Sequence, residues 1–243
     1  MREKGIFANP FRMMSPKLDT EVTRLEDYYK KPYAESVSLE EGLLIMISKE
    51  IEMTRILSKC VVTCPEPLAQ QCQTLAEAIH RQEKVLTRDL VSSKVRGELL
   101  KGVIRFPYRL ERIGDLLESM LRCCRIKARD HIPFSEKAHA ELDQLFAVLT
   151  DMMTNLRDAF RTPNRILLEH ILSQGHKLRQ MVEDFKITHW DRLEAGFCAV
   201  EASPVYRDIL DSFRLINEYL EKMAQTLLDL GARIPTEDAV GQS

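Results

Sequence analysis

Residues 105–121, RFPYRLERIGDLLESML, carry the pattern that decides the fold class of this chain. Apolar side chains recur every three or four residues through the stretch, which is the spacing of one face of an α-helix. The carboxylates of Glu111, Asp115 and Glu118 fall within a narrow sector on the opposite side of the helical wheel. The stretch therefore predicts an amphipathic helix, whose core face is formed by Phe106, Leu110, Ile113, Leu117 and Met120.

The composition of the whole chain also favours helices. Of its 243 residues, 44% are hydrophobic and 30% are charged, and the chain has only 9 glycines, 10 prolines and 7% aromatic residues. So few turn-forming and aromatic residues argue against a β fold with many turns. The net charge of −2 gives no electrostatic reason to expect a nucleic-acid partner, because such proteins usually carry a basic excess.

The sequence shows no sign of a membrane span or a secretory signal. The longest strongly apolar run, residues 43–47, is far shorter than the roughly 20 residues that span a bilayer. The first residues are basic but contain no continuous apolar segment of the kind a signal peptide needs. The 6 cysteines include no CxxC pair, so we expect reduced thiols and predict a cytoplasmic protein.

Caps and prolines divide the chain into six predicted helices. Ser38 begins a capping box with Glu41, Ser135 caps the fourth helix, and Gly231 marks the end of the sixth. Ser203 is expected as an N-cap, with Pro204 at the first helical position. The predicted helices cover about residues 39–62, 67–91, 94–132, 136–160, 164–197 and 204–230.

The helix breaks recur in the second half of the chain. Three pairs of matching residues lie about one hundred positions apart: Ser38 with Ser135, Pro65 with Pro163, and Arg112 with Arg214. We therefore predict an all-α fold, a tandem repeat of two antiparallel three-helix bundles. The repeats are expected at residues 37–133 and 134–231, with an N-terminal arm, flexible or docking, at 1–36 and a polar tail at 232–243.

The acidic row has two interpretations. It is either the solvated face of an amphipathic helix or a site for a cation, since carboxylates one turn apart repel each other unless a positive charge compensates. Glu111 and Asp115 form an ExxxD pair and are the first candidate metal ligands, and Glu118 extends the row. His80 and Glu83, on the second predicted helix, are weaker candidates for further ligands.

Gly114 and Pro107 are unusual residues for a helix interior. Glycine costs a helix about 1 kcal/mol relative to alanine, so we expect another backbone or a ligand to approach closely at Gly114. Pro107 is expected to kink the helix just before the acidic row, because it lacks a backbone donor.

Residues 110–115, LERIGD, resemble the signature of the PhoU family of phosphate-signalling proteins. That family's fold is a pair of three-helix bundles, and the resemblance covers about residues 38–231. The segments HWDRLEAG at 189–196 and SPVYRDIL at 203–210 look like the PhoU-like cytosolic region of sodium/phosphate cotransporters. Five residues stand at positions that match the helix of that region: Asp208, Leu210, Arg214, Ile216 and Asn217.

The resemblance implies a regulator rather than a catalyst. Proteins of this family are associated with restraining phosphate uptake or adjusting the phosphate-starvation response, through contacts with a phosphate transporter or a sensor kinase. Some members bind iron, zinc or other metal clusters at ExxxD motifs, which Glu111 and Asp115 match. This chain departs from the pattern at Arg109, where an acidic residue is often found, and in the second repeat, where Phe213 and Asn217 replace the acidic pair.

Three hypotheses of function follow. The first is a non-catalytic regulator or adaptor of phosphate transport and signalling, a homodimer that acts through protein contacts and a bound metal. The second is a metal-dependent phosphohydrolase that uses Glu111 and Asp115, and the third is a helical scaffold unrelated to phosphate. Because the sequence has no P-loop, GxSxG, HExxH or dinucleotide-binding motif, we predict that the protein is not an enzyme.

Overall fold

The computed structural model describes residues 38–92, 102–162 and 164–231, and these residues form an all-α structure without strands. The arm predicted at 1–36 and the tail predicted at 232–243 lie outside them. None of the helices described is both long and apolar enough to cross a membrane. The six helices are α2 (Leu39–Cys60), α3 (Glu66–Ser92), α5 (Phe106–Arg129), α6 (Glu136–Arg161), α7 (Arg165–Glu194) and α8 (Ala202–Asp229).

Side-chain caps begin three of these helices. The Ser38 hydroxyl accepts a hydrogen bond from the Glu41 backbone N–H (3.2 Å), and the Ser135 hydroxyl accepts one from Ala138 N–H at the same distance. The Asn164 carboxamide oxygen caps α7 by accepting from Ile166 N–H (2.9 Å). These bonds satisfy backbone donors that have no partner within a helix, which confirms the predicted starts of α2, α6 and α7.

The predicted starts of α5 and α8 need correction. Gly102 and Val103 are helical, but a turn at Ile104 and Arg105 separates them from α5, so Pro107 lies in the first turn of a new helix rather than inside a long one. Proline is tolerated there because the first N–H groups of a helix make no intrahelical bond. At α8, Ser203 lies inside the helix instead of capping it, and Gly231, with φ +68°, follows the helix end as predicted.

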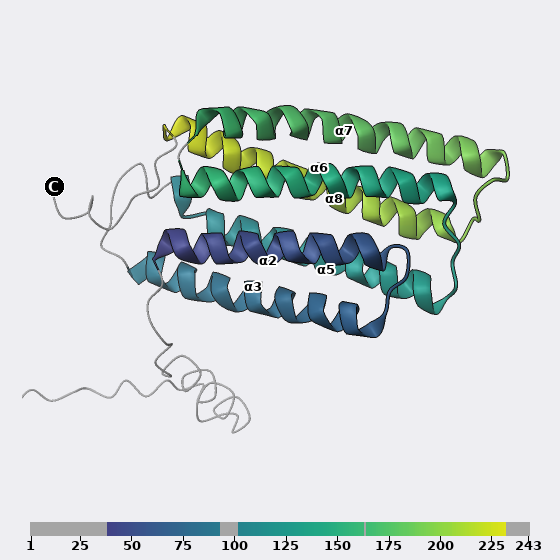
Figure 1. Ribbon diagram of the computed structural model, residues 1–243, viewed down its shortest axis with the longest axis horizontal. Helices are drawn as coiled ribbons and strands as arrows, with labels where there is room; N and C mark the ends of the chain where they lie inside the picture. The colour runs from purple at the N-terminus through teal and green to yellow at the C-terminus, as the bar shows by residue number, and fades with distance from the viewer. Residues whose placement is uncertain (1–37, 93–101, 163, 232–243) are drawn as a thin grey trace, which may run out of the picture. The chain divides into compact units, whose positions relative to one another are not determined.

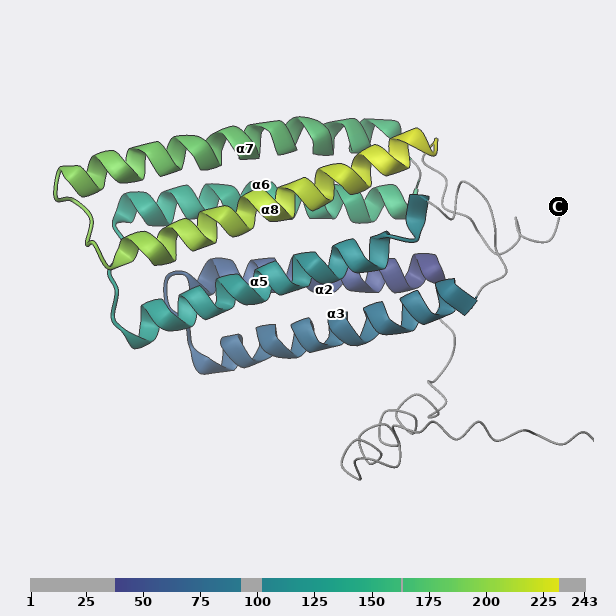
Figure 2. The same cartoon turned by 180° about the vertical axis from the view of Figure 1, so that it is seen from behind.

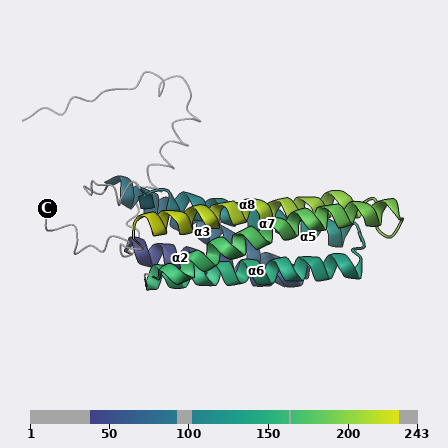
Figure 3. The same cartoon turned by 90° about the horizontal axis from the view of Figure 1, so that it is seen from above.

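Four of the helices form the middle of the unit that begins at Ser38, and two lie at its edges. α2 and α6 lie side by side in one layer and α5 and α8 in the other, with α3 at one edge and α7 at the opposite edge (Figures 1, 2 and 3). α2, α3 and α5 all contact one another, as do α6, α7 and α8, and the two groups meet where α2 packs on α6 and α5 on α8.

One continuous apolar core runs through all six helices. Aromatic pairs join the two groups of helices and strengthen the second group. The Phe106 ring of α5 meets the Phe160 ring of α6 edge to face, with 5.5 Å between centroids. Phe146 of α6 and Phe213 of α8 pack in the same way at 4.8 Å. Burial of these apolar faces is the main favourable contribution to folding.

Glu50 is an acidic residue inside this core. Its side chain is fully buried on α2, and neither carboxylate oxygen has a hydrogen-bond partner. One turn further on, Thr54 donates to the Glu50 carbonyl oxygen (2.8 Å), and its hydroxyl lies 3.5 Å from the Met153 sulfur of α6. Burial raises the pKa of Glu50 well above its ordinary value of 4.5, because the charged form loses its hydration.

Glu50→Gln should therefore stabilise the protein more at neutral pH than near pH 4. Below the ordinary pKa the carboxyl is protonated in both the folded and the unfolded protein, so its ionisation costs nothing. As the pH rises towards the folded pKa, the unfolded chain loses this proton first, and the wild type loses stability that the glutamine variant keeps. Urea unfolding at both pH values measures the difference, with Glu194→Gln as the exposed control. An equal effect of Glu50→Gln at both pH values would contradict this assignment.

Candidate functional site

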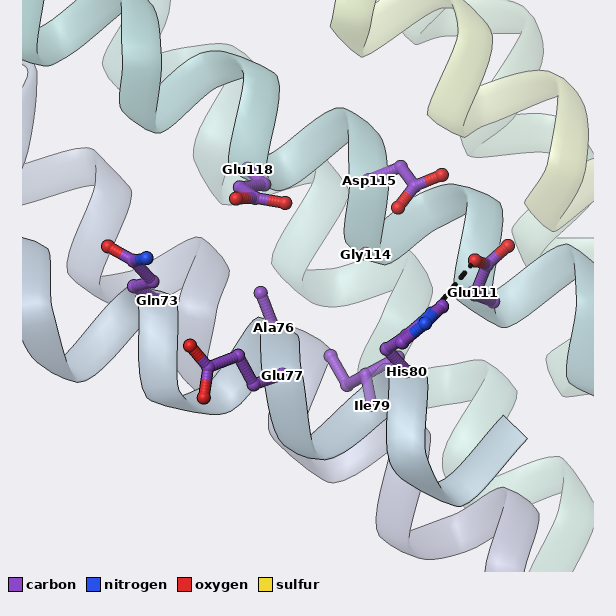
Figure 4. Close-up of a pocket in the computed structure, with 9 residues that line it drawn as sticks. All are labelled: Gln73, Ala76, Glu77, Ile79, His80, Glu111, Gly114, Asp115 and Glu118. Carbon is purple, nitrogen blue, oxygen red and sulfur yellow. Dashed lines mark hydrogen bonds and ion pairs between the residues drawn. The ribbon is translucent and has the colours of Figure 1, made fainter. Parts of the chain in front are cut away.

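The acidic row of α5 faces a depression between α3 and α5. The depression has a volume of about 270 Å³ and brings Glu111, Asp115 and Glu118 together with His80 of α3 (Figure 4). The structure thus places the three carboxylates of the row on one wall, as their spacing predicts. The remaining lining residues are Gln73, Ala76, Glu77, Ile79 and Gly114. Glu77, which sequence reasoning missed, lies on the α3 wall one turn before His80 and Arg81.

Gly114 lies where α3 packs closely on α5. A Cβ atom at this position would lie 3.2 Å from Cγ2 of Ile79, closer than most such contacts. The glycine therefore lets the Ile79 side chain approach the α5 backbone, and this contact accounts for its cost to the helix. The expectation that a backbone or a ligand approaches Gly114 is wrong, because the group nearest to it is the side chain of Ile79.

Each carboxylate of the row has its own basic neighbour. Glu111 Oε1 lies 3.2 Å from His80 Nδ1, and Asp115 Oδ2 accepts a hydrogen bond from Arg112 Nη1 at 2.6 Å. Glu118 Oε1 is 4.0 Å from Arg122 Nη1, the pair expected from their spacing on the helix. These neighbours offset the repulsion among the carboxylates, and they also compete with any other cation for the same oxygens.

The side chains of the depression do not fit a metal ion as they are arranged. In the ranges that the structure describes, no three His, Cys, Asp or Glu residues are grouped so that they could hold one. Glu83 does not line the depression, and it accepts a hydrogen bond from the Thr87 hydroxyl instead (2.7 Å). A metal at Glu111 and Asp115 would compete with Arg112 for the charge of the Asp115 carboxylate.

Arg109 takes part in helix packing. Its guanidinium donates to the Lys222 carbonyl oxygen (3.0 Å) and to the Thr226 hydroxyl (3.1 Å), both on α8. Burial and the nearby charge of Arg105 lower the pKa of Arg109. Since its polar contacts are with α8, Arg109 joins the two groups of helices, a role that its sequence position did not indicate.

Phe213 and Asn217 serve the interior of the second group of helices. Phe213 is fully buried in the core, and the buried Asn217 donates from its carboxamide to the Gly175 carbonyl oxygen of α7 (3.1 Å). Gly175 has no room for a side chain, because a Cβ there would lie 2.8 Å from Asn217 Oδ1. Their burial does not support matching these two residues with Glu111 and Asp115, which line a surface depression. In the register of the buried residues, Arg214 and Glu218 stand at those positions, and they form an ion pair at 2.8 Å.

A buried ion pair in the second group was missed by sequence reasoning. Arg192 of α7 donates two hydrogen bonds, each 2.8 Å long, to the two oxygens of Glu141 on α6. Tyr206 of α8 donates its hydroxyl to Glu141 at 2.6 Å, and Thr188 donates at 3.3 Å. Glu141 is fully buried, so the network links three helices around a carboxylate that water does not reach. Only the presence of Arg192 in the quoted HWDRLEAG segment pointed towards this region.

The pKa shifts around Glu141 have clear physical causes. Burial and the hydrogen bond to Glu141 raise the pKa of Tyr206. Burial alone would lower the pKa of Arg192, but its hydrogen bonds to Glu141 and Cys198 outweigh this effect and raise it. Burial and the charge of Arg192 lower the pKa of His189. The arginine therefore stays charged and the tyrosine neutral, which suits a structural network.

His189 and Ser203 form a hydrogen-bonded pair that has the composition of a nucleophile and its base. His189 Nε2 lies 3.0 Å from the Ser203 hydroxyl. Both side chains are buried, and His189 Nδ1 has no hydrogen-bond partner that would orient the ring. Since the serine is only 8% exposed, this arrangement fits packing of α8 on α7 better than attack on a substrate.

Arg192→Met should destabilise the fold by roughly 3–5 kcal/mol, because it leaves the Glu141 carboxylate buried without its charge partner. Glu141→Leu combined with Arg192→Met should recover most of that loss. Arg165→Met, which breaks an exposed pair with Glu169, is the matched control and should leave the stability almost unchanged. Equilibrium unfolding of the wild type and the three variants measures these changes in stability, and similar losses for Arg192→Met and Arg165→Met would refute the prediction.

Comparison with known proteins gives no match for this chain. No family model matches it, and neither a curated protein nor a solved structure does. The resemblance to the PhoU family thus rests on residues 110–115 and 189–217 of the sequence alone.

Proposed function

We propose that this protein is a non-catalytic regulator of phosphate transport and phosphate signalling that acts by binding other proteins. The observation that carries the proposal is the LERIGD segment, residues 110–115, which resembles the PhoU signature. Its two acidic residues, Glu111 and Asp115, both line the depression between α3 and α5, so the quoted residues share one surface. We further propose that the protein is cytoplasmic and forms a homodimer.

The six helices are proposed to be a tandem repeat of two three-helix bundles, as in that family. The spacing of buried residues supports this, because it is the same in corresponding helices. Leu43, Met46, Ile47, Met53 and Leu57 of α2 have the spacing of Leu142, Leu145, Phe146, Met152 and Leu156 of α6. Phe106, Leu110, Ile113, Gly114 and Leu117 of α5 have the spacing of Ile209, Phe213, Ile216, Asn217 and Leu220 of α8.

A role in protein contacts is supported by an apolar surface at the connection between α7 and α8. We call Ile187, Trp190, Phe197 and Val200 the α7–α8 apolar surface. Their exposed fractions are 61%, 48%, 77% and 70%, which is high for large apolar side chains within fourteen residues of chain. The Arg207 guanidinium lies 5.7 Å from the centre of the Trp190 ring and adds a charge to this surface. Exposed apolar residues gathered in this way are typical of protein-binding surfaces.

Affinity purification of the tagged protein from phosphate-rich and phosphate-starved cells tests this function. A phosphate transporter or a phosphate-responsive sensor kinase should be recovered, in amounts that differ between the two conditions. Trp190→Ala combined with Phe197→Ala should reduce that recovery at least tenfold, because both side chains are proposed contacts. Ile166→Ala, at an exposed position near the start of α7, is the matched control and should leave it unchanged.

The proposal fails if neither class of partner is recovered and a deletion strain takes up phosphate as its parent does. Recovery of unrelated partners only would favour the third hypothesis, a scaffold without a link to phosphate. A phosphatase screen of the purified protein tests the second hypothesis, a metal-dependent phosphohydrolase. Turnover in the wild type that disappears in Glu111→Gln combined with Asp115→Asn would establish catalysis. It would overturn the proposal that the protein is a non-catalytic regulator.

Metal binding at Glu111 and Asp115 stays a prediction. The contact between Asp115 and Arg112 provides a way to test it. Because Arg112 holds Asp115 at 2.6 Å, Arg112→Gln should increase the affinity of the purified protein for Mn²⁺ or Zn²⁺. Glu111→Gln combined with Asp115→Asn should abolish the binding that Arg112→Gln gains. Calorimetric titration and elemental analysis measure both effects, with Arg165→Gln as the control for loss of a surface charge. If Arg112→Gln leaves the affinity for Mn²⁺ and Zn²⁺ unchanged, the depression is not the metal site.

A further inference from the structure

Four of the six cysteines lie together at one end of α2, α3 and α5. Cys60 is the last residue of α2, Cys64 lies in the connection to α3, Cys72 is in α3 and Cys124 is near the end of α5. The α2–α3 connection and the end of α5 meet at the same end of the unit (Figure 1). All four are free thiols, and Cys72 and Cys124 each interact electrostatically with both Cys60 and Cys64.

Cys60 and Cys64 are in direct contact, through a hydrogen bond between their side chains. The backbone explains this contact. Thr63 N–H donates to the Lys59 carbonyl oxygen (3.2 Å), so the chain keeps a helical turn beyond the end of α2. Cys64 follows where this turn ends, four residues after Cys60, so the spacing is CxxxC rather than the CxxC of common redox motifs.

The two thiols differ in their exposure. Cys60 is only 1% exposed, and Cys72 and Cys124 are buried to a similar degree. Cys64, in contrast, is partly exposed. Burial raises the pKa of Cys60 and of Cys72 to about 12 each, so these two thiols stay protonated in the reduced protein. Cys64 is the member of the cluster that a reagent in solution reaches first.

Two cations of α5 contact the α2–α3 connection and the first turns of α3. Lys127 Nζ donates to the Val62 carbonyl oxygen (3.4 Å), and Arg125 donates to Glu66 Oε1 (3.3 Å) and Gln73 Oε1 (3.2 Å). The charge of Arg125 also lowers the pKa of Cys60, against the larger effect of burial. A cation beside a pair of thiols favours the thiolate that attacks a disulfide.

We propose that Cys64 and Cys60 are a redox-active pair that forms an intramolecular disulfide by exchange with a small disulfide such as oxidised glutathione. The Cys64 thiolate attacks one sulfur of the small disulfide, whose S–S bond breaks, and the released thiolate takes up a proton. Cys60 then loses its proton and attacks Cys64 Sγ, releasing the second small thiol. Two protein thiols are oxidised and one small disulfide is reduced to two thiols, so electrons and protons balance.

Cys60, rather than Cys72 or Cys124, is the resolving thiol because it alone among them is hydrogen-bonded to Cys64. A disulfide requires Cβ atoms roughly 3.5–4.5 Å apart, and side chains one helical turn apart start from about 5–6 Å. The short connection of Val61, Val62 and Thr63 has to absorb this difference. Pro65, at the start of α3, restricts adjustment on its other side.

Peptide mapping of the full-length protein tests this pair. The reduced, folded protein is incubated with oxidised glutathione, quenched with acid, denatured, alkylated and cut with trypsin. Cleavage after Lys59 and Arg81 gives one peptide with Cys60, Cys64 and Cys72. In the wild type we expect this peptide to lose two alkylation sites, Cys60 and Cys64, and to keep Cys72. Cys64→Ser should abolish the loss, Cys72→Ser should still form the disulfide, and Cys60→Ser should trap glutathione on Cys64.

Three results would overturn the proposal. These are a disulfide that joins Cys60 to Cys72 or Cys124, oxidation of Cys64→Ser to the same extent as the wild type, and full alkylation of Cys60 and Cys64 in the treated wild type. Because the decisive result comes from the wild type, a variant that folds poorly does not weaken the test. Circular dichroism before and after oxidation verifies that the protein reacts in its folded state.

Discussion

The burial of one apolar face by each helix in a single core is the constraint on which the rest of this structure depends. α2, α5, α6 and α8 meet in the middle, and α3 and α7 cover the edges, so each helix has a solvent face of its own (Figures 1 and 2). The acidic row lies on such a face because the other side of α5 is committed to the core. Polar groups on a core face need partners, and Glu141 has them whereas Glu50 has none.

The two groups of helices use their polar residues differently. In α3 and α5 the carboxylates of the acidic row and His80 line an open depression, and the ion pairs of these carboxylates are partly exposed to water. In α6, α7 and α8 the comparable chemistry is interior, with Arg192 on Glu141 and Asn217 on the Gly175 carbonyl. A surface of exposed pairs can exchange partners at low cost, whereas the buried pairs hold one geometry. The second group therefore has the more fixed internal geometry around its polar residues.

Much of the fold was predictable from the sequence, because helix periodicity and caps are local signals. Ser38, Ser135 and Gly231 act as predicted, and the row of Glu111, Asp115 and Glu118 faces one depression. Long-range partners were not predictable. Nothing in the local pattern placed Glu141 against Arg192, turned Arg109 towards α8 or gathered the cysteines of three helices. The start of α5 was misplaced because a proline in a first turn and a proline at a kink have the same sequence signal.

The network around Glu141 also bears on how the protein opens. It joins residues of α6, α7 and α8 that are 51 and 65 positions apart in sequence, near the end where α6 and α8 begin and α7 finishes. No one of these helices can detach there without exposing the carboxylate or leaving the guanidinium alone in the interior. Backbone amides of the three helices should accordingly exchange with deuterium as one cooperative unit. The exposed pairs of α3 impose no such coupling, so its amides are free to exchange through smaller local openings.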